Sequence, residues 1–262
     1  MTLSGQPRAV AKKMIALSVN VNKIATLRNS RGGTEPSVLQ AVEICLAAGA
    51  PGITVHPRAD ERHIRRQDVL DIAALLRRRP ASDGQRIEFN MEGDPRESFL
   101  DLVHQVRPAQ CTLVPVAPGE ITSQAGWPAT TSSAALGGVV SALRKAGVRV
   151  SLFIDPVPES VRWAASLGAD RVELYTEPFA SAYDAGPAEG RASFARYADA
   201  ATLAHELGLG VNAGHDLDLE NLQLFRTLPF LDEVSIGHAL ITHALWVGLE
   251  QAVTDYLRAL SA

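Results

Sequence analysis

The stretch Gly52-Ile53-Thr54-Val55-His56-Pro57-Arg58 is typical of a short β-strand that ends in polar residues. Ile53 and Val55 alternate with Thr54 and His56, so one face of the strand is apolar and the other is polar. An amphipathic helical pattern precedes this strand and ends in Gly49, and glycine there is a helix C-cap signal. The sequence therefore predicts a unit made of a helix, a glycine stop, a strand and a polar loop.

The same unit recurs along the chain, with further glycine stops at Gly147, Gly168 and Gly208. The predicted strands are Met14–Asn20, Gly52–Pro57, Arg86–Glu92, Gln110–Val116, Val148–Asp155, Arg171–Thr176, Gly210–His215 and Glu233–Gly237. The predicted helices are Val38–Ala48, Gln67–Arg78, Ser98–Val106, Ala134–Ala146, Pro158–Leu167, Phe194–Leu207, Leu219–Leu228 and Leu240–Leu260. Eight strand–helix units predict an α/β protein with a closed (β/α)8 TIM barrel. An open doubly wound sheet is the alternative, but no GxGxxG motif follows the first strand.

Alternation within the third strand predicts a polar barrel interior. Ile87 and Met91 lie on one face, and Glu88, Asn90 and Glu92 lie on the other. A strand of an open parallel sheet is buried on both faces and is apolar throughout, which is not the pattern here. Polar groups inside a barrel need partners, so these residues form either a satisfied hydrogen-bond network or a reactive site.

Composition is that of a globular protein. The 262 residues are 46% apolar and 21% charged, and we expect a flexible tail at 1–13 followed by one barrel domain at 14–262. The net charge of -4 argues against broad binding to nucleic acid or anionic membranes. Cys45 and Cys111 lie in apolar runs, as buried thiols of a reducing compartment do. No apolar run approaches the roughly 18 residues of a membrane span, and we expect a cytoplasmic protein.

Three segments are predicted to be loops. Residues 20–33 follow the first strand and contain Arg28 and Arg31, which are suited to clamp a phosphate. Residues 117–133 are rich in Pro, Gly, Ser and Thr; we interpret them as a lid, in which Thr122 is suited to donate to an anion. Residues 181–192 are predicted to form a mobile excursion after the sixth strand.

Histidines end three of the predicted strands. His56 ends the second, and Gly-His pairs end the seventh and eighth, with the histidines at His215 and His238. Loops at these last two positions recurrently bind phosphate in such barrels. Metal binding is the rival interpretation, but no HxH or HExxH spacing is present. Lys23 is the only lysine near the predicted mouth, which argues against a Schiff-base aldolase with a lysine on the sixth strand.

Several motifs resemble those of the pyridoxine 5'-phosphate synthase family and follow one another in the same order along the chain. They are Val19-Asn20, Ile24–Gly32, Gly52–Arg58, Arg62–Ile64, Val150–Asp155, Val211–His215 and Ile236–Ala239. The resemblance covers almost the whole chain and implies a barrel with additional helices that assembles as a homo-octamer. It implies condensation of 1-deoxy-D-xylulose 5-phosphate with 3-amino-2-oxopropyl phosphate to pyridoxine 5'-phosphate, phosphate and water, without a metal or other cofactor.

The resemblance also implies residue roles. His56 matches the position of a general acid/base in the family, and His215 matches that of a proton donor. Glu92 matches the position of the central carboxylate base, and Glu88 is the alternative residue for that role. Positions that hold the pentulose phosphate are matched by Arg58, His63 and Thr122. Positions that hold the amino-ketone phosphate are matched by Asn20, Arg31, Gly237 and His238. Ring closure needs repeated proton transfers near neutral pH, for which histidine and a buried glutamate are the expected groups.

The chain departs from the family pattern at the predicted mouth. Many members have Asp-His where this chain has Asn22-Lys23, and Asp216 stands where glycine is common. We expect all three residues to contact substrate, with Lys23 supplying a fixed positive charge. Two alternatives stay open: another phosphosugar lyase or isomerase on the same barrel, and a non-catalytic barrel that binds a phosphorylated metabolite.

Overall fold

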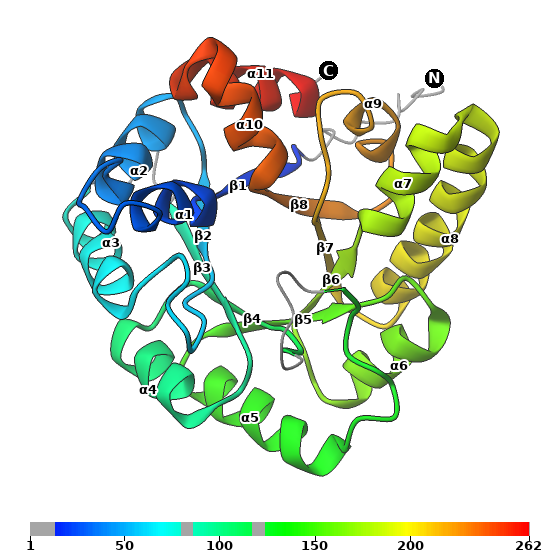
Figure 1. Ribbon diagram of the computed structural model, residues 1–262. Helices are drawn as coiled ribbons and strands as arrows, with labels where there is room; N and C mark the ends of the chain where they lie inside the picture. Colours follow the sequence, from blue (N-terminus) through cyan, green and yellow to red (C-terminus); the bar gives the residue numbers. More distant parts are fainter. Residues whose placement is uncertain (1–13, 80–85, 117–123, 262) are drawn as a thin grey trace, which may run out of the picture.

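Eight parallel strands close into a barrel in chain order, surrounded by helices (Figure 1). The computed structural model describes residues 14–79, 86–116 and 124–261. Its strands are β1 Ala16–Asn20, β2 Gly52–Val55, β3 Glu88–Gly93, β4 Gln110–Leu113, β5 Arg149–Ile154, β6 Arg171–Tyr175, β7 Gly210–Gly214 and β8 Leu231–Ile236. The predicted (β/α)8 barrel is confirmed, and every predicted strand lies within a few residues of an observed one.

The helices form the outer ring of the barrel. They are α1 Asn22–Asn29, α2 Val38–Ala47, α3 Arg66–Arg78, α4 Glu97–Val106, α5 Ser133–Lys145, α6 Pro158–Ser166, α7 Glu177–Ala185, α8 Pro187–Glu206, α9 Leu222–Phe225, α10 His238–Val247 and α11 Leu249–Ser261. The predicted glycine stops are confirmed, because Gly49, Gly147, Gly168 and Gly208 all have positive φ, from 74° to 97°. Glycine adopts this backbone conformation without steric cost.

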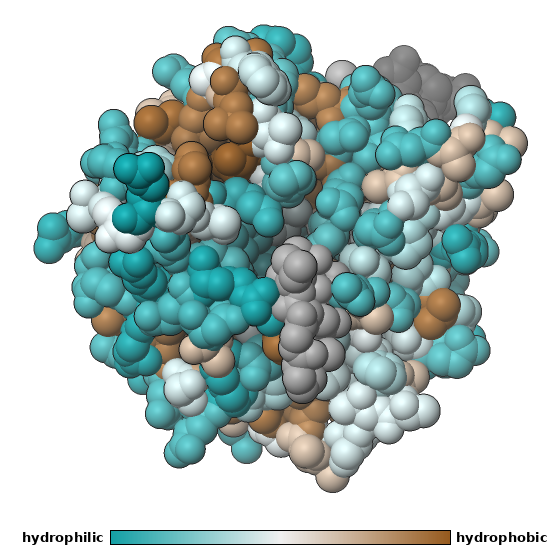
Figure 2. Space-filling model, in the orientation of Figure 1, coloured by the Kyte–Doolittle hydropathy of each residue, from teal (hydrophilic) through white to brown (hydrophobic). Residues whose placement is uncertain are grey.

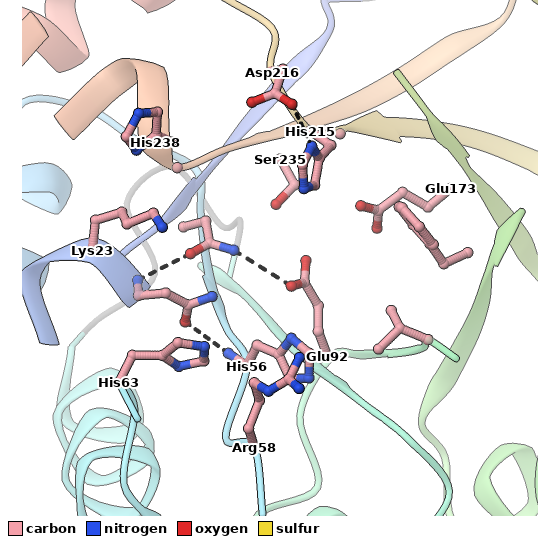
Figure 3. A pocket seen from close by; sticks show the side chains of 16 residues that line it. Lys23, His56, Arg58, His63, Glu92, Glu173, His215, Asp216, Ser235 and His238 are labelled. Atoms are coloured by element: carbon pink, nitrogen blue, oxygen red, sulfur yellow. Dashed lines mark hydrogen bonds and ion pairs between the residues drawn. The ribbon is translucent and has the colours of Figure 1, made fainter. Parts of the chain in front are cut away.

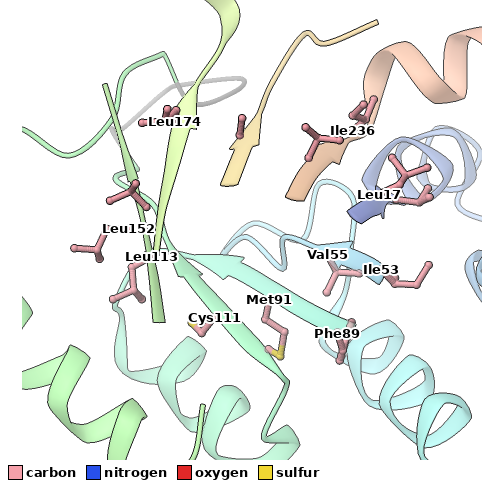
Figure 4. Packing of buried hydrophobic residues seen from close by; sticks show 14 of the residues in the cluster. Leu17, Ile53, Val55, Phe89, Met91, Cys111, Leu113, Leu152, Leu174 and Ile236 are labelled. Atoms are coloured by element: carbon pink, nitrogen blue, oxygen red, sulfur yellow. The ribbon is translucent and has the colours of Figure 1, made fainter. Parts of the chain in front are cut away.

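Strand alternation divides the apolar core from a polar lumen. Apolar side chains such as Ile53, Met91 and Leu152 point outward and pack beneath the helices (Figure 4). The inward face carries a hydrogen-bonded layer: Asn90 Nδ2 donates to Thr54 Oγ1 at 3.3 Å, and Thr112 Oγ1 donates to Asn90 Oδ1 at 3.1 Å. Thr54, Asn90 and Thr112 therefore form a hydrogen-bonded layer across the middle of the lumen, and the polar groups at its carboxyl end face the cavity.

Residues 20–33 were expected to be a loop, and this expectation is wrong for most of them. Residues 22–29 form the helix α1, which buries Ala25 completely and leaves Arg28 only 6% exposed. Its start is held by Asn20, whose Oδ1 accepts from the backbone N–H of Asn22 at 3.0 Å. The segment carries little apolar periodicity because α1 buries only these two side chains.

Residues 181–192 were also expected to be irregular, and they are helical instead. They span the end of α7 and the start of α8, with the break at Gly186 and Pro187. Phe179 anchors α7 in an aromatic cluster with Tyr197 and Phe225, at ring distances of 6.0 and 4.9 Å. The alanines of the segment, which suggested a flexible excursion, are in fact strong helix formers.

One further boundary differs from expectation. The predicted C-terminal helix Leu240–Leu260 is divided into α10 and α11 at Gly248, whose φ is 86°. The predicted tail, and residues 117–123 of the predicted lid, lie outside the described residues. Of that lid, Trp127 is tied to the barrel, because its Nε1 donates to the backbone oxygen of Leu113 at 2.9 Å. Among the described residues, no helix has both the length and the apolar character that a membrane span requires.

Arg28 does not clamp a phosphate, and the prediction that it does is wrong. Its guanidinium forms a two-pronged ion pair with Asp68 of α3, at 2.5 and 2.9 Å, and donates to the backbone oxygen of His63 at 3.3 Å. Both charged side chains are largely buried. The pair holds α1 against α3 and fixes the loop that carries His63.

Arg28→Met is therefore expected to lower the free energy of unfolding by about 3 kcal/mol, because it leaves Asp68 buried without its partner. Urea unfolding followed by circular dichroism measures the change. Arg31→Met is the matched control, since Arg31 is exposed and should change stability by less than about 0.5 kcal/mol. Equal effects of the two substitutions would contradict the structural role of Arg28.

Candidate active site

A cavity of about 390 Å³ opens at the carboxyl end of the strands (Figure 3). Eleven of the thirteen predicted site residues line it: Asn20, Asn22, Lys23, His56, Arg58, His63, Glu92, His215, Asp216, Gly237 and His238. Arg31 is exposed in the turn after α1 and is not among the lining residues, and Thr122 lies outside the described residues. The structure thus gathers groups from both ends of the chain into one site.

Two asparagines tie one wall of the cavity together. Asn20, at the end of β1, donates through Nδ2 to Glu92 Oε2 at 3.4 Å. Asn22 Oδ1 accepts from the backbone N–H of His56 at 2.9 Å. With the bond between Asn20 and the backbone of Asn22, these contacts link the ends of β1, β2 and β3 through α1 (Figure 3).

Glu92 is a buried carboxyl that faces the cavity. Its side chain leaves β3 near the centre of the lumen mouth, with His56 to one side and His215 to the other (Figure 3). Burial, reinforced by the nearby charge of Glu233, raises the pKa of Glu92 to about 8. A carboxyl with this pKa can both take and give a proton near neutral pH. Glu88, the fallback, does not line the cavity; it is ion-paired with Arg149 deeper in the lumen.

Glu173 is a lining residue that the sequence analysis missed. It lies on β6 and is only 4% exposed, and Thr112 Oγ1 lies 3.3 Å from its Oε2. Burial, then the charge of Glu92, raises the pKa of Glu173 well above its usual range. The alternation used for the third strand, applied to Arg171–Tyr175, places Glu173 on the inward face and would have found it.

His56 is neutral in this site. Its ring is buried, and burial, followed by the charges of His63 and Arg58, lowers its pKa to about 3. Burial and the same arginine lower the pKa of His63 to about 4. Among the described residues, no partner lies within hydrogen-bond reach of the buried Nε2 of His56. That nitrogen therefore remains for a substrate.

His215 and Asp216 form a pair at the opposite side of the mouth. His215 Nδ1 lies 2.7 Å from Asp216 Oδ2, and the ring meets the Tyr175 ring edge-on, with centroids 5.3 Å apart. The hydrogen bond from His215 lowers the pKa of Asp216, and the positive charges of His238 and Lys23 act in the same direction. The Asp216 side chain is therefore a carboxylate at neutral pH.

The start of α10 completes the mouth. Gly237 caps the helix and His238 is its first residue, and both line the cavity. A Cβ at Gly237 would lie 3.1 Å from the Cβ of Asn20, so the small residue lets β8 approach β1 closely. The N–H groups at a helix start favour an anion.

Four other lining residues were not among the predicted site residues: Val114, Phe153, Gly214 and Ser235. Val114 and Phe153 form a small apolar cluster with Tyr175, which gives the cavity one apolar side. Within the described part of the chain, no cluster of three or more metal-ligating side chains is present.

Distant solved structures share the fold alone. The 3-keto-L-gulonate-6-phosphate decarboxylase of Vibrio cholerae superposes with a TM-score of 0.60, covering 96% of this chain and 98% of that one, at 9% identity. Sequence relatives are much nearer. Pyridoxine 5'-phosphate synthase of Bacteroides thetaiotaomicron is 51% identical over 248 residues, covering 94% of this chain and 100% of the relative.

The pyridoxine 5'-phosphate synthase of Leptospira biflexa is 52% identical over 258 residues, covering 95% of this chain and 98% of the relative. The family model described as "Pyridoxal phosphate biosynthesis protein PdxJ" matches residues 17–262. That match covers all of the barrel strands except the first residue of β1, and every lining residue of the cavity. The resemblance read from the motifs is confirmed, and the chain belongs to the PdxJ family of pyridoxal phosphate biosynthesis proteins.

Proposed function

We propose that this cavity is the active site of an enzyme that makes pyridoxine 5'-phosphate. Its substrates are 1-deoxy-D-xylulose 5-phosphate and 3-amino-2-oxopropyl phosphate, and phosphate and water are the other products. The observation that carries the proposal is a carboxyl of raised pKa, Glu92, facing a cavity that His56 and His215 enter from either side. Ring closure needs groups that exchange protons near neutral pH, and this arrangement supplies them.

Two ends of the cavity suit two phosphate groups. Arg58, His63 and Lys23 lie on the wall formed by β2 and α1, which suits the pentulose phosphate. Gly237 and His238, at the start of α10, suit the amino-ketone phosphate through backbone N–H groups. Arg31 and Thr122 are proposed to complete these sites when substrates are bound. An anion near Arg58 would also offset the positive charges that hold the pKa of His56 low.

The proposed chemistry uses four groups that line the cavity. In a dehydration step, the Glu92 carboxylate takes a proton from a carbon of the joined substrates, and the released electron pair forms a carbon–carbon double bond. The neighbouring carbon–oxygen bond breaks, and its oxygen takes a proton from His215 and leaves as water. His56, neutral and with its Nε2 open to substrate, passes protons during imine formation. Glu173, kept protonated by burial, donates a hydrogen bond to developing negative charge.

Assembly and location are part of the proposal. Large apolar side chains are exposed at the end of α10, with Leu245 67% and Trp246 82% exposed, and apolar residues gather over α10 on the molecular surface (Figure 2). Such patches typically mark protein–protein contacts, which supports a homo-oligomer, an octamer by family resemblance. We place the enzyme in the cytoplasm, acting on small phosphorylated substrates without nucleic acid, membrane or metal.

The test is a product assay. Both substrates are supplied to the purified protein, and pyridoxine 5'-phosphate and inorganic phosphate are measured together. The proposal predicts both products in equal amounts. Binding of both ligands with no product under any condition would favour a non-catalytic barrel, and turnover of the pentulose phosphate alone would favour a lyase or isomerase.

Lys23→Met is expected to raise KM for at least one substrate about tenfold, because it removes a charge-assisted contact with an anion. Steady-state kinetics with each substrate varied in turn measures the effect. Lys145→Met, an exposed residue at the end of α5, is the charge-matched control. Unchanged KM values for both substrates in Lys23→Met would show that Lys23 does not face them.

A further inference from the structure

We propose that Asp216 is a positioning residue for His215: its carboxylate holds the ring through Nδ1, so that Nε2 is the nitrogen that exchanges a proton with substrate. This inference rests on the proposed function and gives Asp216 a different role from the substrate contact expected from the sequence. The two residues are neighbours at the end of β7 and both line the cavity.

The contact geometry supports a single ring orientation. Nδ1 of His215 and Oδ2 of Asp216 are 2.7 Å apart, within the range of a charge-assisted hydrogen bond. The Tyr175 ring meets the imidazole edge-on from a second side, with an interplanar angle of 76°. Thr176 holds the backbone beneath the ring, because its Oγ1 donates to the carbonyl oxygens of Gly214 and His215. With Nδ1 engaged, Nε2 is the ring nitrogen that is left for the substrate.

The backbone at the pair is unusual and is held by specific contacts. His215 has φ 91° and Asp216 has φ 59°, so two successive non-glycine residues adopt left-handed conformations. Such conformations cost free energy and persist where surrounding contacts impose them, often at functional sites. Here Asn221 Nδ2 donates to the Asp216 carbonyl at 3.0 Å, and the next residue, Leu217, is buried. This backbone turns both side chains toward the cavity mouth.

Charge around the pair favours an ionised Asp216. Lys23 of α1 and His238 of α10 face it across the mouth, and Glu173 of β6 lies on the far side of His215 (Figure 3). A carboxylate at Nδ1 stabilises the imidazolium that forms when Nε2 binds a proton. When Nε2 gives that proton to a leaving oxygen, the ring becomes neutral, its Nδ1 proton stays on the ring, and Asp216 stays ionised. No other reactant is required.

Two variants separate this role from a purely structural one. Asp216→Asn keeps the side-chain shape and removes the charge, and Asp216→Gly removes the hydrogen bond; asparagine and glycine both tolerate the left-handed backbone. Both are expected to lower kcat about tenfold or more while KM changes less than about twofold, because a general acid contributes to turnover and not to ground-state binding. The control is Glu220→Gln, which removes an exposed negative charge six residues after Gly214 without touching His215.

¹⁵N NMR of ¹⁵N-histidine-labelled protein reports which ring nitrogen of His215 carries the proton. A purely structural role of Asp216 would not change that protonation pattern. His215 is assigned by comparison with His215→Gln. The proposal predicts a proton on Nδ1 in the wild type and in Glu220→Gln, and a mixture of ring tautomers in both Asp216 variants. It is overturned if kcat stays within about twofold of wild type in both Asp216 variants, or if the Nδ1 signal of His215 does not change. If the wild type makes no product, the proposed function fails, and the NMR comparison alone decides the role of Asp216.

Discussion

Glu92→Gln is expected to lower kcat by about 10²–10⁴-fold, the usual contribution of a positioned acid or base. Glutamine keeps the shape of the side chain and can still accept from Asn20, but it cannot take a proton. The shape of the cavity and its contacts with both substrates should remain, so KM for each substrate should change little. Steady-state assays of pyridoxine 5'-phosphate formation measure the loss, with Glu220→Gln as the control for removal of a carboxylate.

The pH profile sharpens this prediction. Because burial raises the pKa of Glu92 to about 8, the ionised fraction of the free enzyme rises as the pH goes from 7 to 9. If Glu92 acts as the base, kcat/KM of the wild type should rise over the same interval, and the remaining activity of Glu92→Gln should not. The raised pKa also means that the folded state loses stability as pH rises from about 4.5 to about 8, because it retains a proton that the unfolded chain releases. Glu92→Gln should remove that loss. A flat wild-type profile, or a variant within tenfold of wild type, would contradict the role of Glu92.

His56→Asn is expected to lower kcat by a similar factor, about 10²–10⁴-fold, because it removes the neutral imidazole that lines the cavity. It should also change stability in acid. The folded pKa of His56 is about 3, below the usual value of 6.5, so between these values the unfolded chain binds a proton that the folded protein does not. Stability is therefore lost as the pH falls below about 6.5, at about 1.4 kcal/mol per pH unit.

Unfolding at pH 6.5 and pH 5 measures this effect. Wild type should lose about 2 kcal/mol more than His56→Asn over the interval, provided that the other titrating groups are unchanged. His104→Asn removes an exposed imidazole on α4 and should behave like wild type in both assays. Equal acid sensitivity in wild type and His56→Asn would show that His56 is charged in the folded protein.

Local patterns carry most of the fold. The barrel followed from the period of two in the strands and from the four glycine stops, because both signals depend only on neighbouring residues. The inward face of β3 was predicted correctly. Each of its three polar residues has a different environment in the barrel. Glu88 pairs with Arg149, Asn90 joins the hydrogen-bonded layer, and Glu92 faces the cavity. Their different heights along the barrel axis decide this, and a single strand does not reveal them.

The features that could not be predicted from the sequence depend on contacts between residues far apart in the chain. Arg28 suggested a phosphate clamp because its partner, Asp68, lies forty residues further along the chain. Residues 181–192 suggested a loop because the aromatic cluster that orders them comes from α7, α8 and α9 together. The neutrality of His56 could not be predicted either, because it follows from burial of the ring beside Arg58 and His63. The gathering of strand-end residues was predictable, since parallel strands deliver their carboxyl ends to one mouth.

The central claim is that Glu92, His56 and His215 together close the pyridoxine ring in this cavity. The most direct measurement follows pyridoxine 5'-phosphate and inorganic phosphate in a single turnover, with both substrates bound to wild type, Glu92→Gln and His215→Gln. We expect the wild type to form one equivalent of each product. We expect both variants to bind the two substrates as the wild type does and to form product at least about a hundredfold more slowly. Wild-type enzyme that binds both substrates and forms no product, or variants that form it at the wild-type rate, would contradict this claim.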